Sequence, residues 1–129
     1  GFGNPLAWRP PVYDVGRAHP FFDWGNGVLV TGALLANTAD AITTQRLIAE
    51  GYEEGDPFAR PLVKYGWSGQ IVAMGLETTL EVLGMYGLHR LGRHWIERMV
   101  PAGIATAHGV FAYGNAEDPQ HTPAPGSRE

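Results

Sequence analysis

Cysteine is absent from this chain of 129 residues. Its absence excludes a disulfide framework, thiolate metal ligands, iron–sulfur clusters and a cysteine nucleophile. Positive charge is also scarce, because nine Lys and Arg residues stand against thirteen Asp and Glu residues, for a formal net charge of -4. No lysine-rich stripe is present that would follow a phosphate backbone, so we expect no nucleic-acid partner.

Catalytic motifs are missing as well. The sequence has no glycine-rich phosphate loop, and neither Ser68 nor Ser127 lies in the pattern of a hydrolase nucleophile. Glu-x-x-His spacing, which is typical of di-metal sites in helical bundles, does not occur within the expected helices. We therefore expect neither an enzyme nor a metal site.

Proline is concentrated at the two ends and divides the chain into three regions. Residues 1–25 combine proline, glycine and aromatic residues without periodicity, so we expect an extended arm. Residues 116–129 have the proline-rich composition of a flexible tail. Residues 26–115 show neither strand alternation nor hairpin dipeptides. The sequence therefore predicts an all-α fold, a bundle of about three helices between an arm and a tail.

The predicted helices follow from capping residues and turn formers. The first covers residues 26–50, with Asn26 as its N-cap. The second covers about residues 62–91 and the third about residues 93–114. Pro101 is expected either to kink the third helix or to mark its true start.

Polar residues within these helices fall in narrow stripes at helical spacing, and the remaining surface is apolar or small. A soluble amphipathic helix has a wide polar face, whereas in lipid the apolar face is wide and the few ionisable groups turn inward. We therefore predict an integral bundle in the bacterial inner (cytoplasmic) membrane. Gly32, Gly75 and Gly103, each four residues from another small residue, are expected to let helices approach closely. The predicted polar stripe consists of Asn37, Asp40, Glu77, Glu81 and His108.

Two further groups of residues are predicted to contact lipid or partner proteins. Aromatic residues of the arm are typical of the lipid headgroup level, and packing back on the bundle is the alternative. Arginines near the link between the second and third helices either signal topology or bind anionic lipid or an acidic partner. His89 and His94 in that link are expected to be solvated or lipid-facing. The predicted contact residues are Trp8, Phe21, Phe22, Trp24, Arg90, Arg93 and Arg98.

Two segments also carry a family resemblance. Residues 39–44 and 51–62 resemble the A-D-A-x-T-T and G-x-x-E-x-[ND]-P-x-x-R-P-L motifs of small uncharacterised bacterial membrane proteins, a family of unknown function. Residues 86–98 are similar to the L-H-R-x-G-x-H-x-x-E-R segment of acidobacterial-type hypothetical proteins. The resemblance spans about residues 28–115 and departs at Asp56, where the pattern prefers Asn. It implies a multi-helix membrane protein and little about its chemistry.

Three functions are compatible with these observations. The leading hypothesis is a structural or accessory subunit of a larger bacterial membrane complex, with lipid and other membrane subunits as partners. The second is a proton- or ion-handling membrane protein that uses Asp40, Glu77, Glu81 and His108. The third is a soluble homo-oligomer or filament subunit that buries its apolar helices between copies. No cofactor is predicted, although His108, flanked by small residues, is a candidate ligand for haem or chlorophyll.

Overall fold

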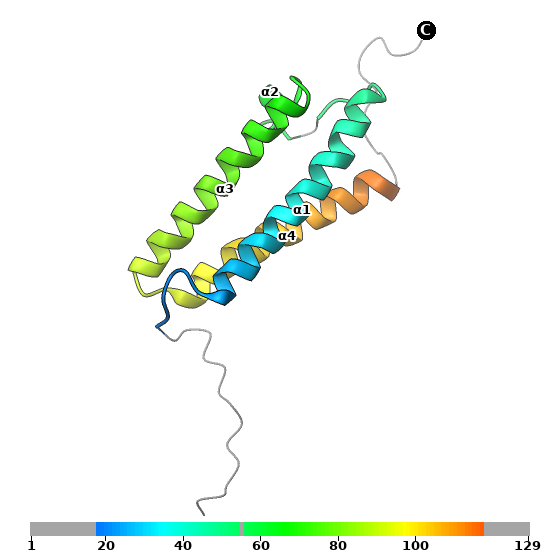
Figure 1. The fold of residues 1–129 in the computed structure, drawn as a ribbon. Helices are drawn as coiled ribbons and strands as arrows, with labels where there is room; N and C mark the ends of the chain where they lie inside the picture. The colour runs from blue at the N-terminus through cyan, green and yellow to red at the C-terminus, as the bar shows by residue number, and fades with distance from the viewer. Residues whose placement is uncertain (1–17, 55, 118–129) are drawn as a thin grey trace, which may run out of the picture.

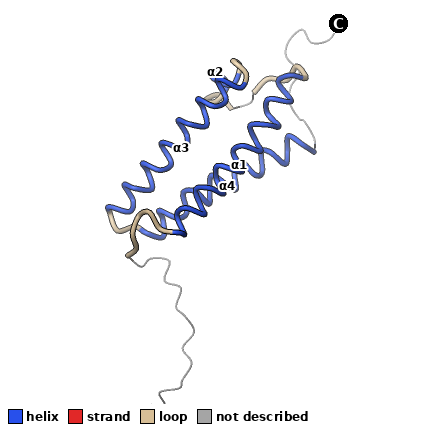
Figure 2. The backbone as a smooth tube through the Cα atoms, viewed as in Figure 1, coloured by secondary structure: helices blue, strands red, loops and turns tan. Residues whose placement is uncertain are grey.

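The computed structural model describes residues 18–54 and 56–117, and this part of the chain is all-α, with four helices and no strand (Figures 1 and 2). The helices are α1 (Trp24–Ala49), α2 (Arg60–Val63), α3 (Trp67–Arg90) and α4 (His94–Glu117). The predicted all-α class with three long helices is confirmed. Trp8 and most of the predicted tail lie outside the described residues.

The long helices alternate in direction, so the segment before α1 lies beside the turn from α3 to α4 (Figure 1). α4 packs mainly along α1, has fewer contacts with α3, and α1 contacts α3 least. Pro101 lies inside α4 and is fully buried, so the alternative in which it starts the helix is wrong. The bundle is therefore built around the α1–α4 pair, with α3 joined to it more loosely.

α1 begins two residues before the predicted N-cap. Asp23 has an extended backbone, and its side-chain Oδ1 accepts a hydrogen bond of 2.8 Å from the backbone N–H of Asn26. This is the standard way in which an acidic residue satisfies a free N–H group at a helix start. The prediction that Asn26 caps the helix is therefore wrong. Its side chain is buried in the bundle instead.

The second predicted helix is divided in two by a corner between α2 and α3. Gly66 has a φ of 72°, in the left-handed region that favours glycine. Beyond the corner, a Cβ atom on Gly69 would lie 1.8 Å from the carbonyl oxygen of Leu62. Glycine at position 69 therefore allows the first turn of α3 to pack against α2.

The interior of the bundle is unusually polar. In the described part of the chain, the buried apolar side chains besides Pro101 are few: Ala33, Ala41, Leu47, Val63 and Met85. The buried polar or charged residues outnumber them: Asn26, Asn37, Thr44, Gln70, Glu81, His94 and Glu97. Hydrophobic burial alone therefore does not explain how these helices are held together.

Large apolar side chains are found mainly on the outside, and α3 shows this most clearly. An 18-residue window of α3 has a mean hydropathy of 1.3, and 11% of that window is buried. Among the described helices, α3 alone is long and apolar enough to cross a membrane. α1 and α4 do not reach the same hydropathy.

The glycines expected to mediate close helix packing do not do so. A Cβ atom added to Gly32, Gly75 or Gly103 would meet nothing within 4 Å. That prediction is therefore wrong for contacts within this chain. Gly75 instead lines an open apolar groove of about 600 Å³, together with Leu34 of α1 and Ile71 of α3.

Candidate functional site

A polar network, here called the central network, joins the three long helices. His108 of α4 lies between two carboxylates, with Nδ1 2.7 Å from Asp40 Oδ2 on α1 and Nε2 2.8 Å from Glu77 Oε1 on α3. Both ring nitrogens thus contact acceptor oxygens. Only the doubly protonated ring can donate to both of them. One positively charged side chain therefore links α1 and α3 to α4.

Side-chain amides complete the central network. Asn37 donates from Nδ2 to Glu77 Oε2 at 2.8 Å. Asn115 lies with Nδ2 3.3 Å from Asp40 Oδ1 and 3.2 Å from Thr43 Oγ1. The structure thus brings together all but one of the residues in the predicted polar stripe.

Glu81, the remaining stripe residue, lies one helical turn beyond Glu77 on α3. It is 5% exposed, and its Oε1 atom has no hydrogen-bond partner among the described residues. Buried carboxylate oxygens normally have partners, because leaving one unpaired is unfavourable. Glu81 therefore stands apart from the satisfied groups of the central network.

The proposed cofactor role of His108 does not fit this geometry. A haem or chlorophyll ligand needs a ring nitrogen with a free lone pair. Both nitrogens of His108 are engaged by Asp40 and Glu77. Binding a macrocycle would first have to break one of these contacts.

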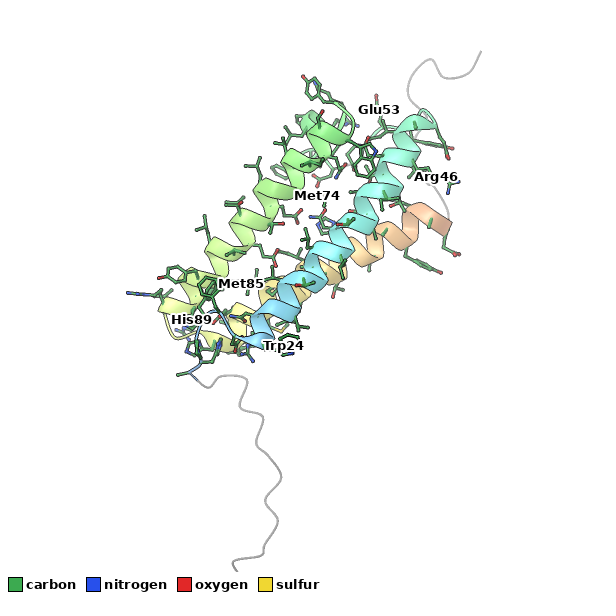
Figure 3. All side chains as sticks on the ribbon, viewed as in Figure 1. Trp24, Arg46, Glu53, Met74, Met85 and His89 are labelled. Carbon is green, nitrogen blue, oxygen red and sulfur yellow. The ribbon has the colours of Figure 1, made fainter. Side chains whose placement is uncertain are left out.

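A second group of polar side chains, here called the histidine cluster, lies where α3 turns into α4, at the end of the bundle marked by His89 in Figure 3. His89 is near the end of α3, His94 and Glu97 lie in the first turn of α4, and His19 comes from the segment before α1. Gly92 permits the turn through its φ of 68°. The ring centroids of the three histidines lie 4.9 to 5.3 Å apart. The four side chains therefore form one compact group.

Glu97 is at the centre of the histidine cluster and is fully buried. Its Oε2 atom lies 3.1 Å from His89 Nδ1, 3.2 Å from His94 Nδ1 and 3.7 Å from His19 Nε2. One candidate ligand atom from each of the four residues lies within 4.8 Å of all the others. Imidazole nitrogens and a carboxylate oxygen are ligands that divalent transition metals accept. Chemically, this cluster is suited to hold a metal ion.

Polar side chains around the histidine cluster support it. Asn26 donates from Nδ2 to Glu97 Oε1. Asp23 Oδ2 lies 3.1 Å from His19 Nδ1 and accepts a hydrogen bond of 2.6 Å from Arg98 Nη2. Burial alone would raise the pKa of the Asp23 carboxyl. The hydrogen bond from the backbone N–H of Asn26 and the charge of Arg98 outweigh this effect, so the pKa lies below its ordinary value. Asp23 is therefore anionic beside the cluster.

The aromatic residues predicted to contact lipid or partners are placed in two ways. Phe22 and Trp24 are 92% and 86% exposed. Phe21 instead packs against Tyr86 and His89, with ring centroids 5.3 and 5.4 Å apart. Of the three predicted aromatic contacts that the structure describes, Phe22 and Trp24 therefore present their rings outward for a partner or for lipid.

The three arginines predicted to contact lipid or partners also differ in their surroundings. Arg90 and Arg93 are exposed at the turn from α3 to α4. Arg98 is paired with Asp23, and its side chain is 25% exposed. Of the three predicted arginines, Arg90 and Arg93 are thus available to lipid headgroups or to an acidic partner.

The sequence analysis missed the histidine cluster. The prediction that His89 and His94 are solvated or lipid-facing is wrong, because His94 is buried and the side chain of His89 is 17% exposed. One local pattern in the sequence could have indicated the cluster. His89 and His94 flank Gly92, and Glu97 follows His94 by one helical turn. The contribution of His19 had no signal, because it depends on how the segment before α1 folds back on the bundle.

Comparisons of this chain with protein-family models, with curated proteins and with solved structures found no match. The resemblance to small bacterial membrane proteins therefore stays a prediction. The function has to be argued from the geometry of the chain.

Proposed function

We propose that this chain is a small integral membrane protein that acts as a structural or accessory subunit of a larger bacterial membrane complex. One observation carries the proposal: the interior of the bundle is polar and its outer faces are apolar. Monomeric soluble proteins rarely expose large apolar patches. In a bilayer, the same arrangement places apolar side chains against lipid or partner helices and keeps polar groups away from both.

The exposure of α3 supports a membrane environment. A core helix of a soluble protein can have the same length and composition, but such a helix is mostly buried, whereas α3 has an 18-residue window of which 11% is buried. Leu76, Leu80 and Leu83 along α3 are 55%, 70% and 60% exposed. These side chains need lipid or a partner to cover them.

The central network explains how the more polar α1 and α4 fit the same environment. Ionisable groups within membranes face the bundle interior and pair with one another. Asp40 and Glu77 do so through His108. Arg90 and Arg93 then favour a cytoplasmic position for the turn from α3 to α4 in the inner membrane.

The groove beside Gly75 supports a protein partner. It lies between α1 and α3 and is lined mostly by apolar side chains. The absence of a side chain at Gly75 leaves the α3 backbone open to close approach, which is typical of helix contacts in membranes. We expect a transmembrane helix of another subunit to lie there.

Extraction of the native membrane with a mild detergent tests the proposal. The extract would be separated by size-exclusion chromatography, and proteins that migrate with this chain would be identified by mass spectrometry. We expect the chain in the membrane fraction and within a defined complex of several subunits. A chain that migrates alone contradicts the accessory role, and a chain that is released by buffer without detergent favours the soluble homo-oligomer.

A proton- or ion-handling role is the second candidate, and Glu81 favours it. Glu81 has a buried carboxylate oxygen with no hydrogen-bond partner in the described part of the chain, one turn from Glu77, and such an oxygen destabilises a purely structural bundle. In the ion-handling role, Glu81→Gln abolishes transport in reconstituted vesicles and leaves assembly intact. If Glu81→Gln assembles and ion flux is unchanged, this second role is contradicted.

A further inference from the structure

We infer that the histidine cluster is a binding site for one divalent first-row transition metal ion, and that zinc fits it well. The ligand atoms would be His19 Nε2, His89 Nδ1, His94 Nδ1 and Glu97 Oε2. The inference is independent of the membrane proposal, because it depends only on the geometry at one end of the bundle.

The spacing of the ligand atoms fits a tetrahedral ion. Zinc binds histidine nitrogen and carboxylate oxygen at about 2.0 to 2.2 Å, which places two tetrahedral ligand atoms about 3.4 Å apart. The three imidazole nitrogens lie 3.1, 3.2 and 3.7 Å from Glu97 Oε2. One ligand atom from each of the four residues lies within 4.8 Å of all the others. Small side-chain rotations therefore suffice to close the site around an ion.

The orientation of His19 is the strongest sign of a cation. Its Nδ1 atom lies 2.8 Å from the carbonyl oxygen of Pro20 and 3.1 Å from Asp23 Oδ2, so Nδ1 is the donor and Nε2 is the nitrogen left to bind an ion. Nε2 is buried, has no hydrogen-bond partner among the described residues, and faces Glu97 Oε2 at 3.7 Å. At 3.7 Å the contact is too long for a hydrogen bond from a protonated Nε2, whereas a metal ion between the two atoms would bind both of them.

Hydrogen bonds outside the ligand set hold two of the ligands in place. Asp23 orients His19 through Nδ1, and Asn26 orients Glu97 through Oε1. Metal-binding histidines typically donate their second N–H to a carboxylate or carbonyl oxygen, and ligating carboxylates are themselves hydrogen-bonded. A purely hydrogen-bonded cluster accounts for His89 and His94, which can both donate to Glu97, but leaves His19 Nε2 unsatisfied.

Four protein ligands fill a tetrahedral site, so its role is structural rather than catalytic. The ion would fasten the segment before α1 to the turn from α3 to α4. Because an ion that binds only the folded state stabilises it, metal binding should raise the melting temperature of the protein.

Metal titration of the untagged 129-residue chain tests this inference. The protein would be purified in detergent, treated with a chelator, and titrated with Zn²⁺ in competition with a chromophoric chelator. We expect one Zn²⁺ per chain and a higher melting temperature. Co²⁺ in the same site should give the intense visible absorption of tetrahedral coordination. Asp23→Asn should weaken binding about tenfold, and His19→Ala more than that.

His19→Ala is the decisive variant, because His19 lies outside the long helices and circular dichroism can confirm that the bundle remains folded. His121→Ala is the matched control: it also removes one histidine, from a position outside the described residues. Wild-type protein that binds no Zn²⁺ overturns the inference. Equal Zn²⁺ affinity of the His19→Ala and His121→Ala proteins overturns it as well.

Discussion

His108 is the single side chain that connects the carboxylates of α1 and α3. Replacing it with alanine leaves Asp40 and Glu77 without their cation. Removing one partner of a buried ion pair costs about 3 to 5 kcal/mol. Because the side chain of Glu77 is 39% exposed, we expect a loss of about 3 kcal/mol, at the lower end of that range. Denaturant unfolding in detergent, followed by circular dichroism, measures it.

Two controls separate the charge effect from a loss of packing. Thr106→Ala, at an exposed position of the same helix, should change the free energy of unfolding by less than about 0.5 kcal/mol. Adding Asp40→Asn to His108→Ala removes one unpaired charge, so the double variant should be more stable than His108→Ala alone. A double variant that is less stable would contradict the assigned role of His108.

Asp23 has two roles at the start of α1 that substitutions can separate. Asp23→Ala removes both the N-cap and the ion pair with Arg98, whereas Asp23→Asn keeps an acceptor for the cap. In metal-free protein, loss of the cap should lower the free energy of unfolding by about 1 kcal/mol, so Asp23→Ala should be less stable than Asp23→Asn. Equal stability of the two variants would show that the cap contributes nothing.

Helical spacing was sufficient to predict that four stripe residues meet in the central network, but not that Glu81 stands apart from them. Asn37, Asp40, Glu77 and His108 lie on polar stripes, and burial of the stripes brings them together. The N-cap was misplaced because Asp23 and Asn26 are both good capping residues, and only the backbone conformation decides between them.

At the level of whole helices, the sequence predicted helix type and length better than helix packing. Periodicity shows which residues share a face, but it does not show how far one helix is rotated toward another. Gly32, Gly75 and Gly103 have the spacing of a close helix contact and nevertheless face open space. The corner before α3 was missed because it depends on the backbone conformation of Gly66.

Two glycines on α3 should respond in opposite ways to the same substitution. Gly69→Ala places a Cβ atom 1.8 Å from the Leu62 carbonyl oxygen, so α2 has to move away and the protein is destabilised. Gly75→Ala meets open space, so alanine's better helix propensity should stabilise the isolated protein by up to about 1 kcal/mol. Thermal unfolding of both variants tests this contrast. If Gly69→Ala is as stable as Gly75→Ala, the tight corner is not present in solution.

At the scale of the whole molecule, the membrane proposal can be tested with one residue type at two exposed positions. Leu80 lies near the middle of α3 and is 70% exposed, whereas Leu91 lies just after its end and is 75% exposed. Arginine at the centre of a spanning helix costs about 2.5 to 3.5 kcal/mol of insertion free energy, and much less near the interface. Leu80→Arg should therefore reduce recovery in the membrane fraction, and Leu91→Arg should not.

This pair of variants is informative because the two alternatives predict different results. In a soluble monomer, both arginines would be solvated and neither would change the distribution between fractions. Equal recovery of Leu80→Arg and Leu91→Arg in the membrane fraction would therefore contradict a spanning α3.

The polar partners of α1 have a consequence for the order in which the protein is synthesised. Asp23, Asn26 and Asp40 all form side-chain contacts with α4. The ribosome synthesises α1 first and α4 last among these helices. Until α4 has been synthesised, these side chains of the nascent chain therefore lack their hydrogen-bond partners. A nascent chain that has not reached residue 94 cannot complete the bundle, and its assembly becomes a single late event rather than a helix-by-helix process.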